Sequence, residues 1–203
     1  SGSLPEMVAA YQHKADEIEL KITELRKARK QLVWFHEVLG KMLQPLEEVD
    51  ETEIGQVKLV EMPEHRLLMV REQVIYDYPS MLKLYNQLLK KLFEQRCKVV
   101  GGLRTIFYGG YEDIYHKKID MALAFLLEPE SKRGNKQPAQ RFLSCLHRGK
   151  YPTSLQAYNK IQQYAEKNGL KLCGPVGHAL RVPIASVKDP NATVFEVIIP
   201  LVD

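Results

Sequence analysis

The chain has 203 residues and a formal net charge of +4, and 45% of its residues are hydrophobic and 27% charged. This composition is that of a globular protein and excludes a disordered or collagen-like chain. The longest apolar runs, such as residues 121–127, fall far short of the roughly 20 residues that a membrane-spanning helix needs.

The mild positive charge is well below the dense basic stripe of dedicated nucleic-acid binders. The chain opens with Ser-Gly-Ser, which resembles an expression scar, and no signal-peptide pattern follows. Cys97, Cys145 and Cys173 are far apart and form no Cys-x-x-Cys pair. We therefore expect no disulfide framework and no zinc knuckle, and a reducing, cytoplasmic location fits this cysteine usage.

Residues 5–45 carry the pattern of one long helix. Pro5 and Pro45 are expected at its two ends, with no proline between them. Apolar residues recur at alternating steps of three and four, which is a heptad pattern. The seam consists of Tyr11, Ala15, Ile18, Ile22, Leu25, Leu32, Leu39 and Leu43, with Arg29 and His36 at two polar positions. Such a helix is about 60 Å long, which favours a dimerisation coiled coil over the alternative, a helix packed on its own domain.

From residue 55 onward the pattern changes to short strands and two amphipathic helices. Helices are expected at residues 78–95 and 154–168, the second with Ser154 or Thr153 as its N-cap and Gly169 just beyond its end. A polar, turn-rich loop is expected between two strands, at residues 128–138. Strands are expected at residues 57–61, 66–71, 99–108, 118–127, 141–146, 172–182 and 193–202.

The two helical segments begin with related sequences. Residues 78–102 and the segment 73 positions later share seven identities over 25 positions. These are Tyr78/Tyr151, Pro79/Pro152, Leu82/Leu155, Tyr85/Tyr158, Asn86/Asn159, Lys98/Lys171 and Gly101/Gly174. Each copy follows the order strand, helix, strand, strand. We therefore expect an α+β fold with one antiparallel sheet and pseudo-twofold symmetry, and a ligand groove where the copies meet.

Catalytic and metal-binding motifs are absent from the sequence. We find no phosphate-binding loop, no Gly-x-Ser-x-Gly and no His-Glu-x-x-His, and the six histidines are scattered. We therefore expect no metal, no cofactor and no enzymatic activity.

Binding residues are suggested by aromatic and charged side chains. Tyrosine accounts for ten of the 203 residues, and its apolar ring with a polar tip suits a pocket for flat or cationic molecules, although each ring can equally pack in the core. Strand alternation places His178 and Leu180 on one face, with Thr105 and Phe107 at the matching positions of the first copy. Glu196 is the single charge of an apolar strand, where it needs a partner or a ligand unless it points to solvent.

Four short motifs resemble the GyrI-like effector-binding domain in their order and spacing. They are His147-Arg148-Gly149-Lys150-Tyr151, then Leu155 with Tyr158, then Gly174-Pro175, and finally Phe-Glu-Val-Ile-Ile-Pro-Leu at residues 195–201. The heptad helix before them is similar to the linker and dimerisation helix of MerR-family transcription regulators. The resemblance implies a coiled-coil helix over residues 4–46 and a GyrI-like effector-binding domain over residues 55–203.

The resemblance implies the ligand-sensing part of a cytoplasmic, dimeric transcription activator whose linker helices form an antiparallel coiled coil. Its partners would be a small aromatic or lipophilic effector, as in multidrug-binding members, and a second copy of the chain. DNA would be bound only through a domain preceding residue 4, and no membrane is expected as a partner. The expected ligand contacts are Tyr78, Phe107, Tyr151, Tyr158, His178, Leu180 and Glu196.

One departure from the family pattern affects the expected ligand. In multidrug-sensing members, a buried glutamate follows the Gly-Pro motif, and an apolar pocket residue comes two positions after that glutamate. In this sequence His178 stands at the position of the glutamate and Leu180 at that of the apolar residue. A histidine favours a neutral or anionic ligand over a cation. Two alternatives stay open: a small hydrolase of the same fold that uses Glu196 with a tyrosine, and a protein-binding inhibitor, against which the long helix argues.

Overall fold

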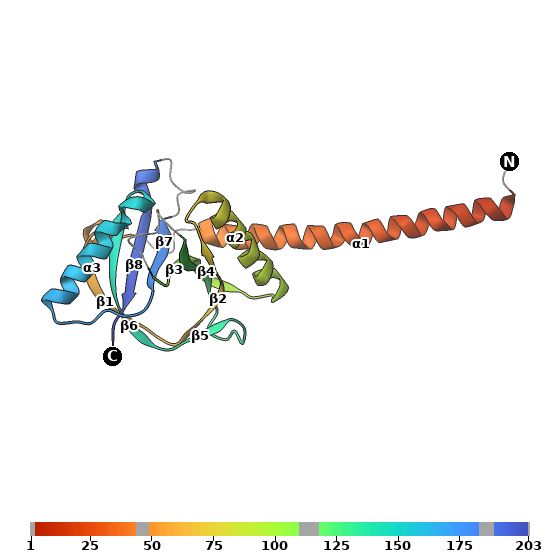
Figure 1. Cartoon of the computed structure of the whole chain (residues 1–203). Coiled ribbons are helices and arrows are strands. Elements are labelled where there is room, and N and C mark those ends of the chain that lie inside the picture. Colours follow the sequence, from red (N-terminus) through yellow and green to blue (C-terminus); the bar gives the residue numbers. More distant parts are fainter. Residues whose placement is uncertain (1–2, 44–48, 110–117, 183–188, 203) are drawn as a thin grey trace. The chain divides into compact units, whose positions relative to one another are not determined.

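The computed structural model describes residues 3–43, 49–109, 118–182 and 189–202. The chain forms two compact units, Ser1–Gly40 and Lys41–Asp203, and each is described here by itself (Figure 1). None of the described helices has the length and apolarity that crossing a membrane requires.

The first unit holds all but the last three residues of helix α1 (Leu4–Leu43), which confirms the long helix predicted from the heptad pattern. Six seam residues are between 49% and 75% exposed: Leu4, Val8, Tyr11, Ile18, Leu25 and Leu32. Leu4 and Val8 continue the predicted seam toward the N-terminus. The predicted helix end at Pro45 lies outside the described residues.

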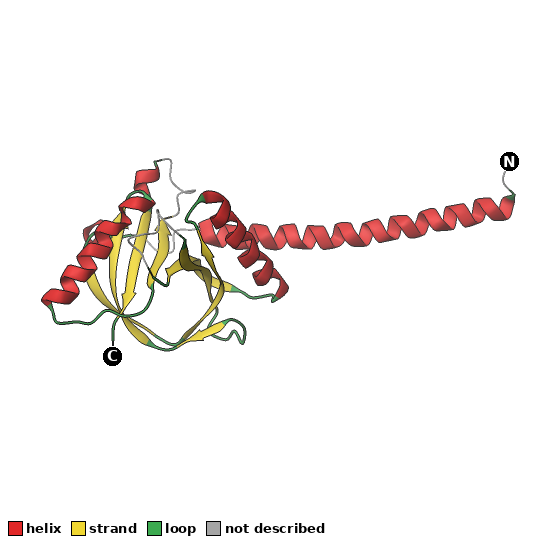
Figure 2. Cartoon of the chain, in the orientation of Figure 1, coloured by secondary structure: helices red, strands yellow, loops and turns green. Residues whose placement is uncertain are grey.

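The second unit is built on one antiparallel sheet, in which the described strands follow the order β1-β6-β8-β7-β3-β4-β2-β5. The strands are β1 (Val57–Met62), β2 (His65–Val74), β3 (Val99–Phe107), β4 (Ile119–Leu127), β5 (Asn135–Gln137), β6 (Gln140–Arg148), β7 (Val176–Val182) and β8 (Val194–Pro200). The other elements are helices α2 (Tyr78–Glu94) and α3 (Leu155–Lys167) and the 3-10 turns η1 (Glu51–Glu53), η3 (Tyr151–Ser154) and η5 (Pro190–Ala192). Figure 2 shows the sheet curled, with both long helices of this unit on its outer side.

The sheet order confirms the duplication. The strands β6-β8-β7 belong to the second copy of the repeat. They are followed in the sheet by β3-β4-β2, the equivalent strands of the first copy, in reverse order. At the centre, β3 pairs with β7, and Thr105 lies opposite His178. These two residues are 73 positions apart, which is the offset of the sequence repeat. The pseudo-twofold axis therefore passes through this pair.

Apolar packing on one face of the sheet holds the helices in place. Helix α2 buries Leu84, Leu88, Leu89 and Leu92, one apolar stripe at helical spacing, against β2 and β4. Helix α3 buries smaller side chains, Ala157, Ile161 and Ala165, and lies on β6, β1 and β8. Asp77 caps α2, since its carboxylate accepts a 2.8 Å hydrogen bond from the amide of Ser80.

Three local predictions were wrong. Residues 135–137 of the predicted loop form β5, because they pair with the start of β2. Strand β7 begins at Val176 instead of residue 172, and Leu172 makes only a single bridge to Leu201. Ser154 occupies the N-cap position of α3 but its side chain makes no capping bond, because the turn η3 leads directly into the helix. Gly169 lies just beyond α3 with a φ of 63°, as predicted.

Candidate functional site

The two faces of the sheet differ in what covers them. On β7, His178 points toward the helix-covered face, where its ring contacts Phe107 with 5.2 Å between ring centroids. Its neighbours Gly177 and Ala179 therefore face the other side, because side chains alternate along a strand. We call this second face, across β1, β6, β8, β7 and β3, the groove. Two hollows lie next to each other along these strands.

The first is the apolar hollow, which encloses about 120 Å³. Its walls include the apolar residues Met62, Leu67, Ile106, Phe142, Ile198 and Pro200. Gly177 on β7 lies opposite Ile198 on β8, and a Cβ atom at position 177 would be 2.7 Å from Ile198 Cγ1. The absence of a side chain at Gly177 thus lets Ile198 cover the floor of the hollow.

A charged residue also lines the apolar hollow. Arg104 comes from β3, and its Nη1 atom donates to the sulfur of Met62 at 3.6 Å. Burial lowers the pKa of Arg104, an effect that Arg181 reinforces and that the nearby Glu196 opposes. Among the described residues, no carboxylate lies within ion-pair distance of this guanidinium. The hollow therefore presents a half-buried cation among mainly apolar side chains, with Gln137 and Gln140 as amide-bearing members of its lining.

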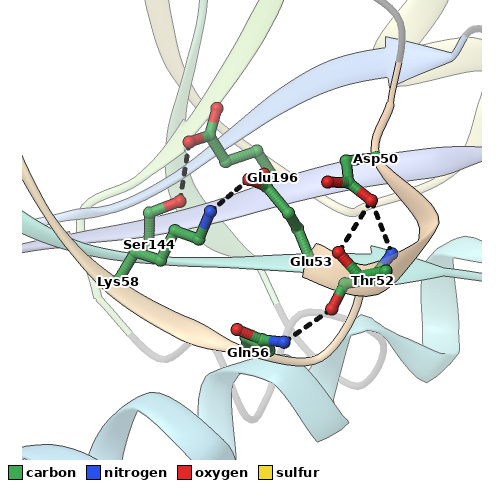
Figure 3. Close-up of polar contacts among 7 residues, drawn as sticks. All are labelled: Asp50, Thr52, Glu53, Gln56, Lys58, Ser144 and Glu196. Carbon is green, nitrogen blue, oxygen red and sulfur yellow. Dashed lines mark hydrogen bonds and ion pairs between the residues drawn. The ribbon is translucent and has the colours of Figure 1, made fainter.

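The second is the polar hollow, with about 350 Å³. It lies between η1 and four strands of the groove, β1, β6, β8 and β7, and it adjoins the apolar hollow along these strands. Ser144 Oγ donates a 2.6 Å hydrogen bond to Glu196 Oε1, and Arg181 Nε donates a 2.8 Å bond to Glu196 Oε2. Both oxygens of this carboxylate are therefore engaged within the protein. Figure 3 shows Glu196 with Ser144 and the neighbouring side chains.

The rim of the polar hollow carries further charges (Figure 3). Lys58 forms an ion pair with Glu53. Asp50 accepts hydrogen bonds from the amide and the hydroxyl of Thr52, at 2.9 and 2.7 Å, and these bonds lower the pKa of Asp50. With Glu196 and Arg181 added, three carboxylates face two cations, so this hollow has an excess of one negative charge.

Of the seven residues predicted to contact a ligand, Glu196 lies in the groove. Strand alternation correctly placed Thr105, Phe107 and His178 on one face, but this is the face that the helices cover. Phe107 is 1% and His178 2% exposed; His178 borders the apolar hollow, yet its ring packs in the core between Phe107 and Phe195. Burial lowers the pKa of His178 to about 3 and keeps the ring neutral.

The remaining four predicted residues lie elsewhere. Tyr78 begins α2 and is 78% exposed. Tyr158 lies on α3 and accepts a 2.9 Å hydrogen bond from Gln162. Leu180 is half-buried and alternates with the groove-facing Ala179. Tyr151 opens η3, and its side chain lies outside the described residues. Ligand contact by any of the seven stays a prediction.

Sequence reasoning missed Arg104 and Arg181. Both carried the signal that singled out Glu196, because each is the only Asp, Glu, Lys or Arg of its strand. Ser144 was also missed, and it had no comparable signal.

The fold agrees with the comparison to known families. The model of the GyrI-like small molecule binding domain matches residues 55–202. The chain belongs to this family. Among curated proteins, none matches the chain.

Solved structures share the fold of this GyrI-like protein. The C-terminal domain of EcmrR aligns with a TM-score of 0.61 and 21% identity, over 73% of this chain and 98% of that domain. EcmrR in its DNA complex aligns with a TM-score of 0.61 and 19% identity, over 98% of this chain and 77% of that one. A hydrolase from Listeria innocua has a TM-score of 0.57 at 11% identity, over 73% of this chain and 93% of that one.

The geometry around Glu196 bears on the hydrolase alternative. Such a mechanism needs a free carboxylate next to a tyrosine. Glu196 bonds to Ser144 and Arg181, and no tyrosine within the described ranges lines the polar hollow.

Proposed function

We propose that the GyrI-like domain of this chain senses a small organic molecule in the groove, as the effector-binding part of a MerR-type transcription regulator. The observation that carries the proposal is the apolar hollow on the face of the sheet opposite α2 and α3, in a domain whose family is described as small-molecule binding. A concave, mainly apolar site with few polar groups is the usual form of such a pocket. The engaged state of Glu196 supports binding without turnover.

In this proposal helix α1 pairs with its counterpart in a second copy as an antiparallel coiled coil. Its exposed apolar seam supports this role, since a helix in water buries such a stripe against a partner. The similarity to EcmrR extends over 98% of this chain and thus includes α1. DNA contacts would come from a separate DNA-binding domain, and the regulator would act in the cytoplasm.

Ligand binding regulates such a dimer only if the ligand has different affinities for two arrangements of the molecule. The groove supports this requirement because β7 and β3, one from each copy of the repeat, meet at its centre. A ligand that contacts both strands would favour one relative position of the two halves over another.

A thermal-shift panel of lipophilic cations, neutral aromatics and organic anions tests the proposal. A ligand present at 100 times its dissociation constant adds about 2.7 kcal/mol of stability and raises the melting temperature by roughly 5–10 °C. Ile106→Trp fills the apolar hollow and should abolish this shift. Val100→Trp, on the same strand but outside the hollow, should preserve it. A shift that survives Ile106→Trp, or no shift from any compound, would contradict the proposal.

The hydrolase alternative has its own test. We expect no turnover of p-nitrophenyl acetate above that of the Glu196→Gln variant. Hydrolysis by the wild type that this substitution removes would replace the sensor proposal with an enzymatic one.

A further inference from the structure

Arg104 lies where the burial of a positive charge is energetically unfavourable. The walls around it are largely apolar, and the hydrogen bond that its side chain makes is to the thioether of Met62, a weak acceptor. Transfer of a guanidinium from water to such surroundings is unfavourable unless an anion or several good acceptors compensate. The fold nevertheless places this half-buried side chain in the wall of the hollow.

The nearest groove carboxylate does not compensate this charge. Arg104 lies opposite Ala179 on β7, and Ala179 in turn lies opposite Glu196 on β8, so a whole strand separates the two charged residues. Glu196 is held by Ser144 on one oxygen and by Arg181 on the other. Glu196 therefore attracts Arg104 at long range but makes no contact with it.

The other cations of the groove are paired. Lys58 pairs with Glu53 and Arg181 with Glu196. His65 borders the apolar hollow, and its Nδ1 lies 2.9 Å from the carbonyl oxygen of Pro63. Burial lowers the pKa of His65, which favours the neutral ring. Within the described part of the groove, Arg104 is thus the cation that has no carboxylate.

We propose that the apolar hollow binds a small amphipathic anion, with its carboxylate on the guanidinium of Arg104 and its apolar body between Met62, Phe142 and Ile198. This inference rests on the proposed function and names the class of its ligand. The planar guanidinium matches a carboxylate through two parallel hydrogen bonds.

Size and charge narrow the ligand class further. The hollow encloses about 120 Å³, close to the volume of about 150 Å³ that accepts a benzene molecule in an engineered cavity. One aromatic ring or a branched aliphatic chain therefore fits. The acidic excess of the adjoining polar hollow repels a second anionic group, so the ligand is a monoanion.

Isothermal titration calorimetry on the whole chain with three compounds that share a 4-ethylphenyl body tests the inference: 4-ethylbenzoate, 4-ethylbenzamide and 4-ethylbenzylammonium. We expect the benzoate to bind at least tenfold more tightly than the amide, because a charge-assisted hydrogen bond replaces a neutral one. The ammonium compound should bind most weakly. Arg104→Gln should remove the preference for the benzoate, and Arg104→Lys should retain part of it.

A matched control is Arg141→Gln, which removes one positive charge from an exposed residue of β6 and should leave the preference unchanged. The comparison of benzoate and amide in the wild type needs no variant, so a folding defect of Arg104→Gln does not remove the test. Equal affinity for benzoate and amide, or a preference that Arg104→Gln retains, overturns the anion inference. If other compounds then bind in a manner sensitive to Ile106→Trp, the sensor proposal stands; if nothing binds, both proposals fail.

Discussion

At the scale of single residues, burial decides which form a titratable group adopts. His178 is 2% exposed and packs between Phe107 and Phe195 in the core under the helices. Water does not solvate the imidazolium there, so the folded protein binds a proton at this ring far less readily than the unfolded chain does. His178 therefore makes stability depend on pH.

Acidification should destabilise the protein through His178. Its pKa is lowered from 6.5 to about 3 by burial, so below pH 6.5 the unfolded chain binds about one proton more at this residue than the folded chain. The free energy of unfolding then falls as the pH is lowered from 6.5 toward 3, by up to about 1.4 kcal/mol per pH unit. Urea denaturation at pH 7, 6, 5 and 4 measures this slope.

His178→Gln removes the titrating ring while the other histidines remain. We expect the free energy of unfolding of this variant to fall less steeply with acidification than that of the wild type. The difference in slope should correspond to about one bound proton, or about 1.4 kcal/mol per pH unit. Parallel curves for the wild type and this variant would show that His178 titrates normally in the folded protein.

Single residues also show how far the candidate site can be predicted. Glu196 was visible in the sequence because a lone charge in an apolar strand requires a partner, and the structure supplies two. His178 and Phe107 were correctly placed on one face, but alternation does not tell which face the helices cover. A shift of one residue exchanges the two faces. The groove is thus lined by the neighbours Gly177, Ala179 and Arg104.

At the scale of elements, the 73-residue offset of the repeat predicted a residue pairing in addition to the duplication itself. It identified Thr105 and His178 as equivalent, and in the sheet these residues lie opposite each other on the symmetry axis. The helices were predictable because their apolar stripes are long and periodic. Strand β5 was not, because its three residues pair with β2 through backbone bonds and carry no apolar pattern.

The cross-strand pair of Gly177 and Ile198 is an element-level feature with a measurable consequence. An added Cβ at Gly177 would meet Ile198 Cγ1 at 2.7 Å and Cδ1 at 3.0 Å, so the isoleucine must move. Gly177→Ala should lower the free energy of unfolding by about 1–3 kcal/mol, the usual cost of overpacking. Chemical denaturation measures this loss.

A double-mutant cycle isolates the contact. Ile198→Ala removes both of the atoms that the new methyl group meets, so Gly177→Ala should cost much less in that background. Gly169→Ala serves as a contrast, because its φ of 63° strains an alanine while no atom lies within 4 Å of the added Cβ; its cost should not depend on Ile198. Additive losses for Gly177→Ala and Ile198→Ala would rule out the steric account.

At the scale of the whole molecule, the two units differ in how they are stabilised. Residues 41–203 contain the sheet with both packed helices and thus their own core, whereas α1 exposes its apolar seam. A 40-residue helix with such a seam gains little from propensity alone and is stabilised mainly by packing against another helix. The proposed coiled coil would supply that packing.

The seam predicts which substitutions separate the dimer. Ile18 and Leu25 lie on it, so Ile18→Glu combined with Leu25→Glu should bury charge in the coiled coil and yield a monomer at micromolar concentration. Leu20 offers a matched control because it is 68% exposed, against 69% for Leu25, but lies on the opposite side of the heptad. Leu20→Glu should therefore remain a dimer. Sedimentation equilibrium measures the mass of each protein.

Removal of residues 1–40 separates the role of α1 from that of the sheet. The truncated chain should be monomeric, melt cooperatively and still bind the ligand of the groove, because the lining residues of both hollows belong to the second unit. A wild type that is monomeric at micromolar concentration would exclude the coiled coil. A truncated chain that remains dimeric would instead place the interface on the sheet unit, and the exposed seam of α1 would then need a different partner.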